Sequence, residues 1–172
     1  GSVFHRDGID LDTLKHLKEV RHVKLHEYLD THPQAEFIPV SDYPADGHAV
    51  WRIPGQTAFP CATQNELDKQ DAETLIANGC IAVSEGANMP TTVEAIKVLQ
   101  DAKALYGPGK AANAGGVATS ALEMQQNASR DSWSFEKTEE RLAVIMHNIH
   151  DTCAETAEEY GTPGDYVLGA NI

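Results

Sequence analysis

From residue 56 onward, short apolar runs alternate with amphipathic stretches, and this alternation restricts the fold more than any other feature of the chain. Parallel strands joined by crossover helices produce such a pattern. The expected strands are residues 57–60, 80–83 and 104–106, and the expected helices are residues 68–78, 91–102, 111–127 and 134–158. The sequence therefore predicts an α/β fold, a three-layer Rossmann-like domain with a mostly parallel sheet.

Local signals support these boundaries. Asp68 is a good N-cap and Gly79 a good C-terminal stop for the first helix. Thr91, followed three residues later by Glu94, has the spacing of a capping box that opens the next helix. The continuous apolar run 80–83 is typical of a parallel strand buried on both faces.

The N-terminal third is less regular. Five leucines at near-helical spacing predict a helix over residues 10–29. Residues 32–56 contain four of the eight prolines and show no clear periodicity, so we expect an irregular stretch there. Residues 36–40 and 48–51 are candidates for short strands within it.

Composition excludes several kinds of partner. The chain has 172 residues, the size of one domain, and a net charge of −13 that repels nucleic acids and anionic membranes. Its apolar runs are all shorter than the roughly 20 residues needed to cross a bilayer, and no signal-peptide pattern is present. The three cysteines fit reduced thiols better than a disulfide framework. We therefore expect a cytoplasmic protein with neither a nucleic-acid nor a membrane partner.

Three expected strand-to-helix loops, residues 60–66, 85–91 and 108–116, each contain an asparagine. In a parallel sheet these loops meet at the carboxyl edge, where open α/β folds bind ligands. An amide both donates and accepts hydrogen bonds, so it suits a carboxamide or a hydroxyl. A turn-forming role is the commoner explanation for any single loop, but three similar loops on one edge favour a ligand site.

The third loop has two further features. Gly115 and Gly116 stand where a helix should begin, although each costs about 1 kcal/mol there relative to alanine. Helical spacing puts a mostly small-residue face on one side of that helix, either as a ligand wall or as a tight packing surface against the sheet. This face comprises Asn113, Gly116, Val117, Ser120 and Met124.

Two other chemistries have candidate residues in the sequence, a metal site and a cysteine nucleophile. His147, His150 and Cys153 lie three residues apart on an expected helix. Each three-residue step falls about 60° short of a full helical turn, so the three side chains point in different directions and cannot all bind one metal ion. Cys61 lies at the ligand edge without the adjacent base that a nucleophile needs. We therefore expect no metal site, and packing at a strand end for Cys61.

Several long motifs follow one another along the chain. They are FPCATQNEL at 59–67, LIANG at 75–79, EGANMPTT at 85–92, PGKAANAGGVATSALEM at 108–124, RLAVIMHNIHDTC at 141–153 and YVLGANI at 166–172, with a weaker match at DGID, 7–10. In this order and spacing they resemble the cofactor domain of the glutamate dehydrogenases, especially the bacterial hexameric NADP-linked type.

The resemblance implies a parent enzyme that interconverts L-glutamate with 2-oxoglutarate and ammonia, using NADP or alternatively NAD, as a homohexamer. It implies that Gln64 and Asn65, with the adjacent Thr63, contact the ribose and nicotinamide region and that Asn88 lies near the nicotinamide. Ser120 would donate a hydrogen bond to the distal carboxylate of glutamate. Val117 would line that pocket, and Asn113 would approach both ligands.

The resemblance also implies what the chain lacks. The family's catalytic lysine and aspartate and its G-x-G-x-x-G turn lie outside these residues, so we expect residues 1–172 to be a partial C-terminal dinucleotide-binding domain, truncated at both ends and inactive alone. Gln56-Thr57 replace a usual Asp-Ile, and Ala121 a usual glycine. The alternative is a non-catalytic binding or interaction domain derived from this fold.

Overall fold

The computed structural model describes residues 1–45 and 47–172; Asp46, within the stretch expected to be irregular, lies outside the described residues. Its centre is a parallel sheet of three strands in the order β3-β4-β5. Thr57 pairs with Ala82 and Val83 with Tyr106. The expected α/β fold with a parallel sheet is confirmed. The strands are β3 (Thr57–Ala58), β4 (Ala82–Ser84) and β5 (Leu105–Gly107).

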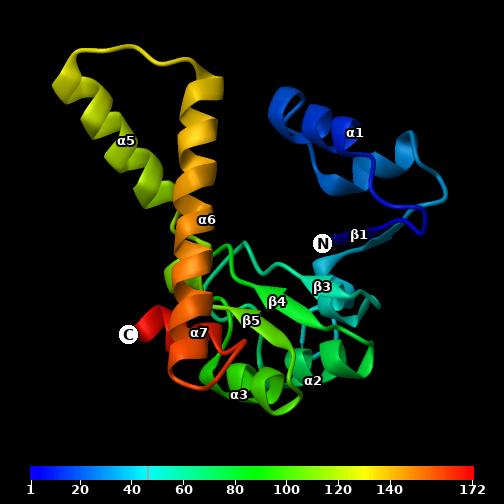
Figure 1. Ribbon diagram of the computed structural model, residues 1–172. Helices are drawn as coiled ribbons and strands as arrows, with labels where there is room; N and C mark the ends of the chain where they lie inside the picture. The colour runs from blue at the N-terminus through cyan, green and yellow to red at the C-terminus, as the bar shows by residue number, and fades with distance from the viewer. Residues whose placement is uncertain (46) are drawn as a thin grey trace.

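Helices cover both faces of this sheet (Figure 1). The helices α2 (Lys69–Ala77) and α3 (Val93–Asp101) pack together on one face. The long helix α6 (Phe135–Glu159) stands over the other face and contacts α4 (Gly109–Ala112) and α7 (Tyr166–Asn171). The helix α5 (Gly115–Ser129) and the first half of α6 form a hairpin that projects from the sheet.

The main core lies between the sheet and the α2–α3 layer. Along each strand, core residues alternate with more exposed ones, because successive side chains of a β-strand point to opposite faces of the sheet. Val83 is 1% exposed, whereas its neighbours Ala82 and Ser84 are half-buried, so β4 is less deeply buried than expected. The core comprises Trp51, Ala58, Leu67, Ala72, Leu75, Cys80, Val83, Ala95, Leu99 and Tyr106.

The ends of α2 form as the sequence predicts. The Asp68 side chain accepts a hydrogen bond from Asp71 N at 2.9 Å, and Gly79 has φ 89° just beyond the last turn. The expected capping box at Thr91 is wrong by one residue, because Thr92 accepts from Ala95 N and begins α3. Thr91 is drawn inward instead, where its N–H donates to Glu85 Oε1.

The single helix expected at residues 10–29 is wrong. The chain forms α1 (Leu11–Lys15), a π-helical turn η1 (His16–Val20), a left-handed residue at His22, and a 3₁₀ helix η2 (Leu25–Asp30). Leu17 and Tyr28 belong to one small core, although a straight helix would hold them about 16 Å apart. Burial of Tyr28 therefore requires the chain to turn back.

Three further expectations change in detail. Residues 36–40 do form a strand, β2 (Glu36–Ile38), but it pairs antiparallel with β1 (Ser2–Phe4), which the sequence did not indicate. A strand at 48–51 is wrong: the 3₁₀ helix η4 (Ala49–Arg52) buries Trp51, and another, η3 (Val40–Asp42), precedes it. The helix expected at 111–127 is divided into α4 and α5.

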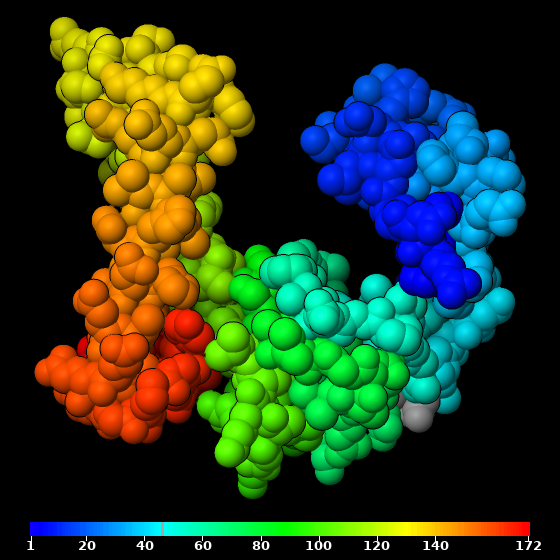
Figure 2. Space-filling model, turned by 45° about the vertical axis from the view of Figure 1, so that its right-hand side comes forward, coloured from blue at the N-terminus to red at the C-terminus, as the bar shows by residue number. Residues whose placement is uncertain are grey.

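The view in Figure 2 shows the N-terminal lobe, which consists of β1, α1, η1, η2 and β2 (residues 2–38), and the α5–α6 hairpin rising on two sides of the sheet, with open space between them. At the other end, α7 crosses α6 closely, because a Cβ on Gly169 would collide with the backbone of Cys153. Among the described residues, no helix is long and apolar enough to span a membrane.

Candidate nicotinamide and substrate site

The three asparagine-bearing loops meet at the carboxyl edge of the sheet, as expected. Together with the start of α5 they enclose a cavity of about 730 Å³. Five of the residues expected to bind cofactor or substrate lie in its wall. The lining comprises Cys61, Ala62, Thr63, Gln64, Gly86, Ala87, Asn88, Lys110, Asn113, Ala114, Gly116 and Val117.

A second cavity of about 810 Å³ adjoins the first and shares Gln64, Asn88, Lys110 and Asn113 with it. Asn65 lies here. Its backbone is left-handed, with φ 57°, and its N–H donates to Met89 O at 3.0 Å, which ties the first loop to the second. The wall common to the two cavities therefore carries three amide side chains and one lysine.

Asn113, the C-cap residue of α4, connects the second and third loops. Its Nδ2 donates hydrogen bonds to Ala87 O and to Asn88 Oδ1, both at 2.8 Å. These two bonds use both N–H groups of the Asn113 amide. The carbonyl oxygen of Asn113 is left to accept a hydrogen bond from a ligand. The amino group of Asn88 is left to donate one to it.

Beneath these asparagines lies Glu85, the first residue after β4, which is 5% exposed. Its Oε1 accepts from Tyr106 OH at 2.5 Å and Thr91 N at 3.2 Å, and its Oε2 accepts from Gly109 N at 2.5 Å. Burial, and then the hydrogen bond to Glu85, raise the pKa of the Tyr106 phenol far above its usual range. Tyr106 therefore stays a neutral donor, and the charge of Glu85 is satisfied inside the protein.

The first turns of α5 form one wall of the first cavity. Val117 is 71% exposed and Met124 72% exposed, whereas the buried residues of α5 are Ala118 and Leu122. The face that carries Asn113 and Ser120 is thus not packed against the sheet. Ser120 is exposed and donates to Gly116 O at 3.2 Å, one turn beyond the lining of the first cavity.

Sequence reasoning overlooked two residues of this site, Glu85 and Lys110. Lys110 contributes a positive charge to the lining of both cavities, and its Nζ donates to Asn171 Oδ1 at 2.9 Å. Both residues belong to the motifs EGAN and PGKAAN, so their place in the loops was visible. Apart from Thr91, their partners lie 21 to 61 residues away in sequence and were not visible.

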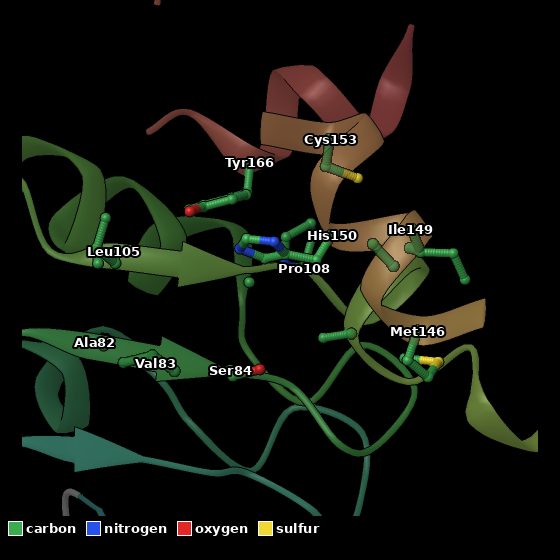
Figure 3. Close-up of a pocket in the computed structure, with 13 residues that line it drawn as sticks. Ala82, Val83, Ser84, Leu105, Pro108, Met146, Ile149, His150, Cys153 and Tyr166 are labelled. Carbon is green, nitrogen blue, oxygen red and sulfur yellow. The ribbon is translucent and has the colours of Figure 1, made fainter. Parts of the chain in front are cut away.

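A third cavity, of about 300 Å³, lies between the sheet and α6 (Figure 3). Its wall is mostly apolar and includes Leu105, Met146 and Ile149. His150 and Cys153 also line it, but the His150 imidazole packs against Tyr166 with ring centroids 5.5 Å apart. This cavity lies on the sheet face beside α4, and it contains none of the residues expected to bind cofactor or substrate.

Neither alternative chemistry gains support. Within residues 1–45 and 47–172, no group of three or more His, Cys, Asp or Glu side chains could hold a metal ion. His147 Nδ1 bonds Ala143 O of its own helix at 2.7 Å. Cys61 is exposed at the cavity wall, and its sulfur lies against Gly86, where an added Cβ would collide with it.

An open parallel sheet with amide-bearing loops at its carboxyl edge defines the class: an α/β domain of the kind that binds nucleotide cofactors. The chain belongs to the glutamate/leucine/phenylalanine/valine dehydrogenase family, whose sequence profile matches residues 1–172.

The relatives agree with this membership. The chain is 51% identical over 172 residues to an NADP-specific glutamate dehydrogenase of Helicobacter pylori, covering all of this chain and 38% of that protein. It is 58% identical over 127 residues to the NADP-specific glutamate dehydrogenase of Escherichia coli, covering 74% of this chain and 28% of that one. The crystal structure of Plasmodium falciparum glutamate dehydrogenase superimposes with a TM-score of 0.87 at 42% identity, over 98% of this chain and 36% of that one. The chain thus spans little more than a third of the length of relatives that it matches throughout.

Proposed function

We propose that residues 1–172 form part of the dinucleotide-binding domain of an NADP-dependent dehydrogenase that interconverts L-glutamate with 2-oxoglutarate and ammonia. The family membership and the 51% identity to an NADP-specific glutamate dehydrogenase support this proposal. The expected catalytic lysine and aspartate are assigned to no residue of this chain.

The observation that carries the proposal is the bond between Asn113 and Asn88. It leaves one carbonyl acceptor and one amino donor at the shared wall of the two cavities. A primary carboxamide such as that of nicotinamide needs this pair, because it presents an N–H donor and a C=O acceptor side by side. Asn113 would accept from the carboxamide nitrogen, and Asn88 would donate to its oxygen.

The first loop would hold the adjoining ribose. Thr63 and Gln64 line the first cavity and Gln64 and Asn65 the second, so hydroxyl and amide groups are available along both. Such neutral donors and acceptors suit the hydroxyls of a sugar. Lys110 adds a positive charge beside them.

The α5 wall would hold the substrate. Val117 offers an apolar surface for the methylene groups of glutamate, and the Ser120 hydroxyl would turn to donate to the distal carboxylate. NADP, when bound, supplies an acceptor for the hydride that leaves the α-carbon of glutamate. The residues of this chain would bind and orient the two ligands. The amides would fix the plane of the carboxamide, and α5 would fix the side chain of the amino acid.

Three further parts of the proposal do not depend on the geometry of the site. NADP is favoured over NAD because of the relatives' specificity. A homohexameric assembly and a cytoplasmic location stay predictions from the sequence.

A kinetic assay of the full-length protein that contains these residues tests the proposal. We expect NADPH formation to depend on glutamate and to be much slower with leucine, phenylalanine or valine. Faster turnover of any of those three would overturn the substrate assignment and leave the cofactor site standing. Absence of turnover with all four, together with absence of NADPH binding, would favour a non-catalytic domain instead.

A further inference from the structure

Glu85 is a buried carboxylate that binds none of the expected ligands, and yet it sits under the residues proposed to do so. It is 5% exposed at the end of β4, where burial of a charge is costly unless donors surround it. Three donors do surround it, and they come from three segments: Thr91 N, Tyr106 OH and Gly109 N.

Each donor fixes a different part of the site. The bond from Thr91 N closes the loop 85–91 on itself, and Asn88 stands in the middle of that loop. The bond from Tyr106 ties the loop to the neighbouring strand β5. The bond from Gly109 N holds the first residue of α4, the short helix that ends at Asn113.

The helix α4 transmits this position to Asn113 directly. Asn113 N donates to Gly109 O at 3.0 Å, so one turn of helix separates the residue that Glu85 holds from the residue that faces the ligand. The space around Gly109 is tight, because a Cβ there would lie 2.9 Å from Glu85 Oε2 and 3.3 Å from Asn113 Nδ2. A shift of the Glu85 carboxylate would therefore move α4.

We propose that Glu85 is the positioning residue of the site: its carboxylate sets the distance between loop 85–91 and α4, and thereby aligns Asn88 and Asn113 for one carboxamide. The consequence for NADPH binding rests on the proposed function, whereas the consequence for the two asparagine side chains does not.

Glu85→Gln tests this role with the smallest change in shape. The Gln amide can still accept from Tyr106 and Thr91, but its NH₂ group would face Gly109 N, and two donors cannot bond each other. We expect α4 to shift and the KM for NADPH to rise about ten- to a hundredfold, because small misplacements of binding groups have effects of this size. The KM for 2-oxoglutarate should change less.

Asp71→Asn is the matched control. Asp71 is also a buried carboxylate, 1% exposed, and it joins two segments by accepting from His48 N at 3.0 Å and capping α2. It lies outside the lining of both cavities. Its substitution should lower thermal stability as much as Glu85→Gln does and leave the KM for NADPH unchanged.

Nuclear magnetic resonance of the 172-residue chain gives a readout that needs no cofactor. The side-chain amide signals of Asn88 and Asn113 should shift and exchange faster with water in Glu85→Gln and stay in place in Asp71→Asn. Unchanged asparagine signals in Glu85→Gln would overturn the positioning role, even if the protein proves to be a glutamate dehydrogenase. Shifted signals with no NADPH binding by the unsubstituted full-length protein would retain the positioning role and refute the proposed function.

Discussion

The side chain of Asn113 donates a hydrogen bond to the side chain of Asn88, with 2.8 Å between Nδ2 and Oδ1. The two residues are 25 positions apart in sequence and belong to separate loops, so the bond fixes one loop against the other. It also decides which amide atoms remain for a ligand.

Asn113→Asp should break this arrangement, because a carboxylate would face the carbonyl oxygens of Ala87 and Asn88 without a proton to donate. Losing two hydrogen bonds at a half-buried site should weaken NADPH binding by about 1–3 kcal/mol. Fluorescence titration of the full-length protein measures this. Asn78→Asp is the control, since Asn78 Nδ2 also donates to a backbone carbonyl, that of Arg52, far from the cavities. Equal loss of affinity in both variants would contradict the proposed contact.

Gly116→Ala separates helix stability from ligand binding. A Cβ at either Gly115 or Gly116 meets nothing within 4 Å, so each substitution should stabilise α5 by about 0.5–1 kcal/mol. Gly116 lines the first cavity and Gly115 does not. Gly116→Ala should therefore weaken NADPH or glutamate binding, whereas Gly115→Ala should not. Thermal unfolding and titration check the two effects, and unaltered binding in Gly116→Ala would show that the open space at this glycine serves no ligand.

Ser120→Ala should raise the KM for glutamate about tenfold or more in the full-length protein, the usual effect of losing a hydrogen bond to a charged group. The KM for NADPH should change much less. Ser129→Ala is matched to it, because Ser129 Oγ also donates back to a carbonyl of α5, that of Gln125, away from the cavities. Equal effects of Ser120→Ala on both ligands would refute its place in the substrate pocket.

Tyr106 should make stability depend on alkaline pH. Because its pKa is raised in the folded protein, the fold keeps the phenol protonated, and its contribution is complete below the ordinary pKa of about 10. Above that pH the unfolded chain loses the proton first, so stability falls as pH rises. Urea unfolding should give a free energy of unfolding that is about 1–3 kcal/mol higher for the unsubstituted protein than for Tyr106→Phe at pH near 7. This difference should shrink above pH 10. Parallel pH curves would contradict the Tyr106–Glu85 bond.

The parts of the fold that the sequence predicted are those that short-range physics decides. Asp68 and Gly79 end α2 because a cap acts within a few residues. The three loops meet because parallel strands bring their carboxyl ends to one edge. Gln64, Asn88 and Asn113, one from each of these loops, accordingly line one cavity.

What sequence reasoning missed depends on distant partners. Helix propensity favoured a single helix through residues 10–29, but tertiary contacts of Tyr28, which include a hydrogen bond from Asp10 N to its hydroxyl at 2.8 Å, override it. Thr92 displaced Thr91 as the cap because Glu85 binds Thr91 N. Glu85 itself looked like one more loop carboxylate, since nothing nearby reveals its bonds to Tyr106 and Gly109.

The most direct test of the central claim is a ¹H–¹⁵N titration of the 172-residue chain with nicotinamide mononucleotide. This ligand carries the carboxamide and the adjoining ribose, so its binding does not require a pyrophosphate turn. We expect the side-chain amides of Asn88, Asn113 and Gln64 and the backbone of Gly116 to shift together with one saturation curve. Shifts confined to the cavity between the sheet and α6, or unchanged spectra at saturating ligand, would contradict a nicotinamide site at the carboxyl edge.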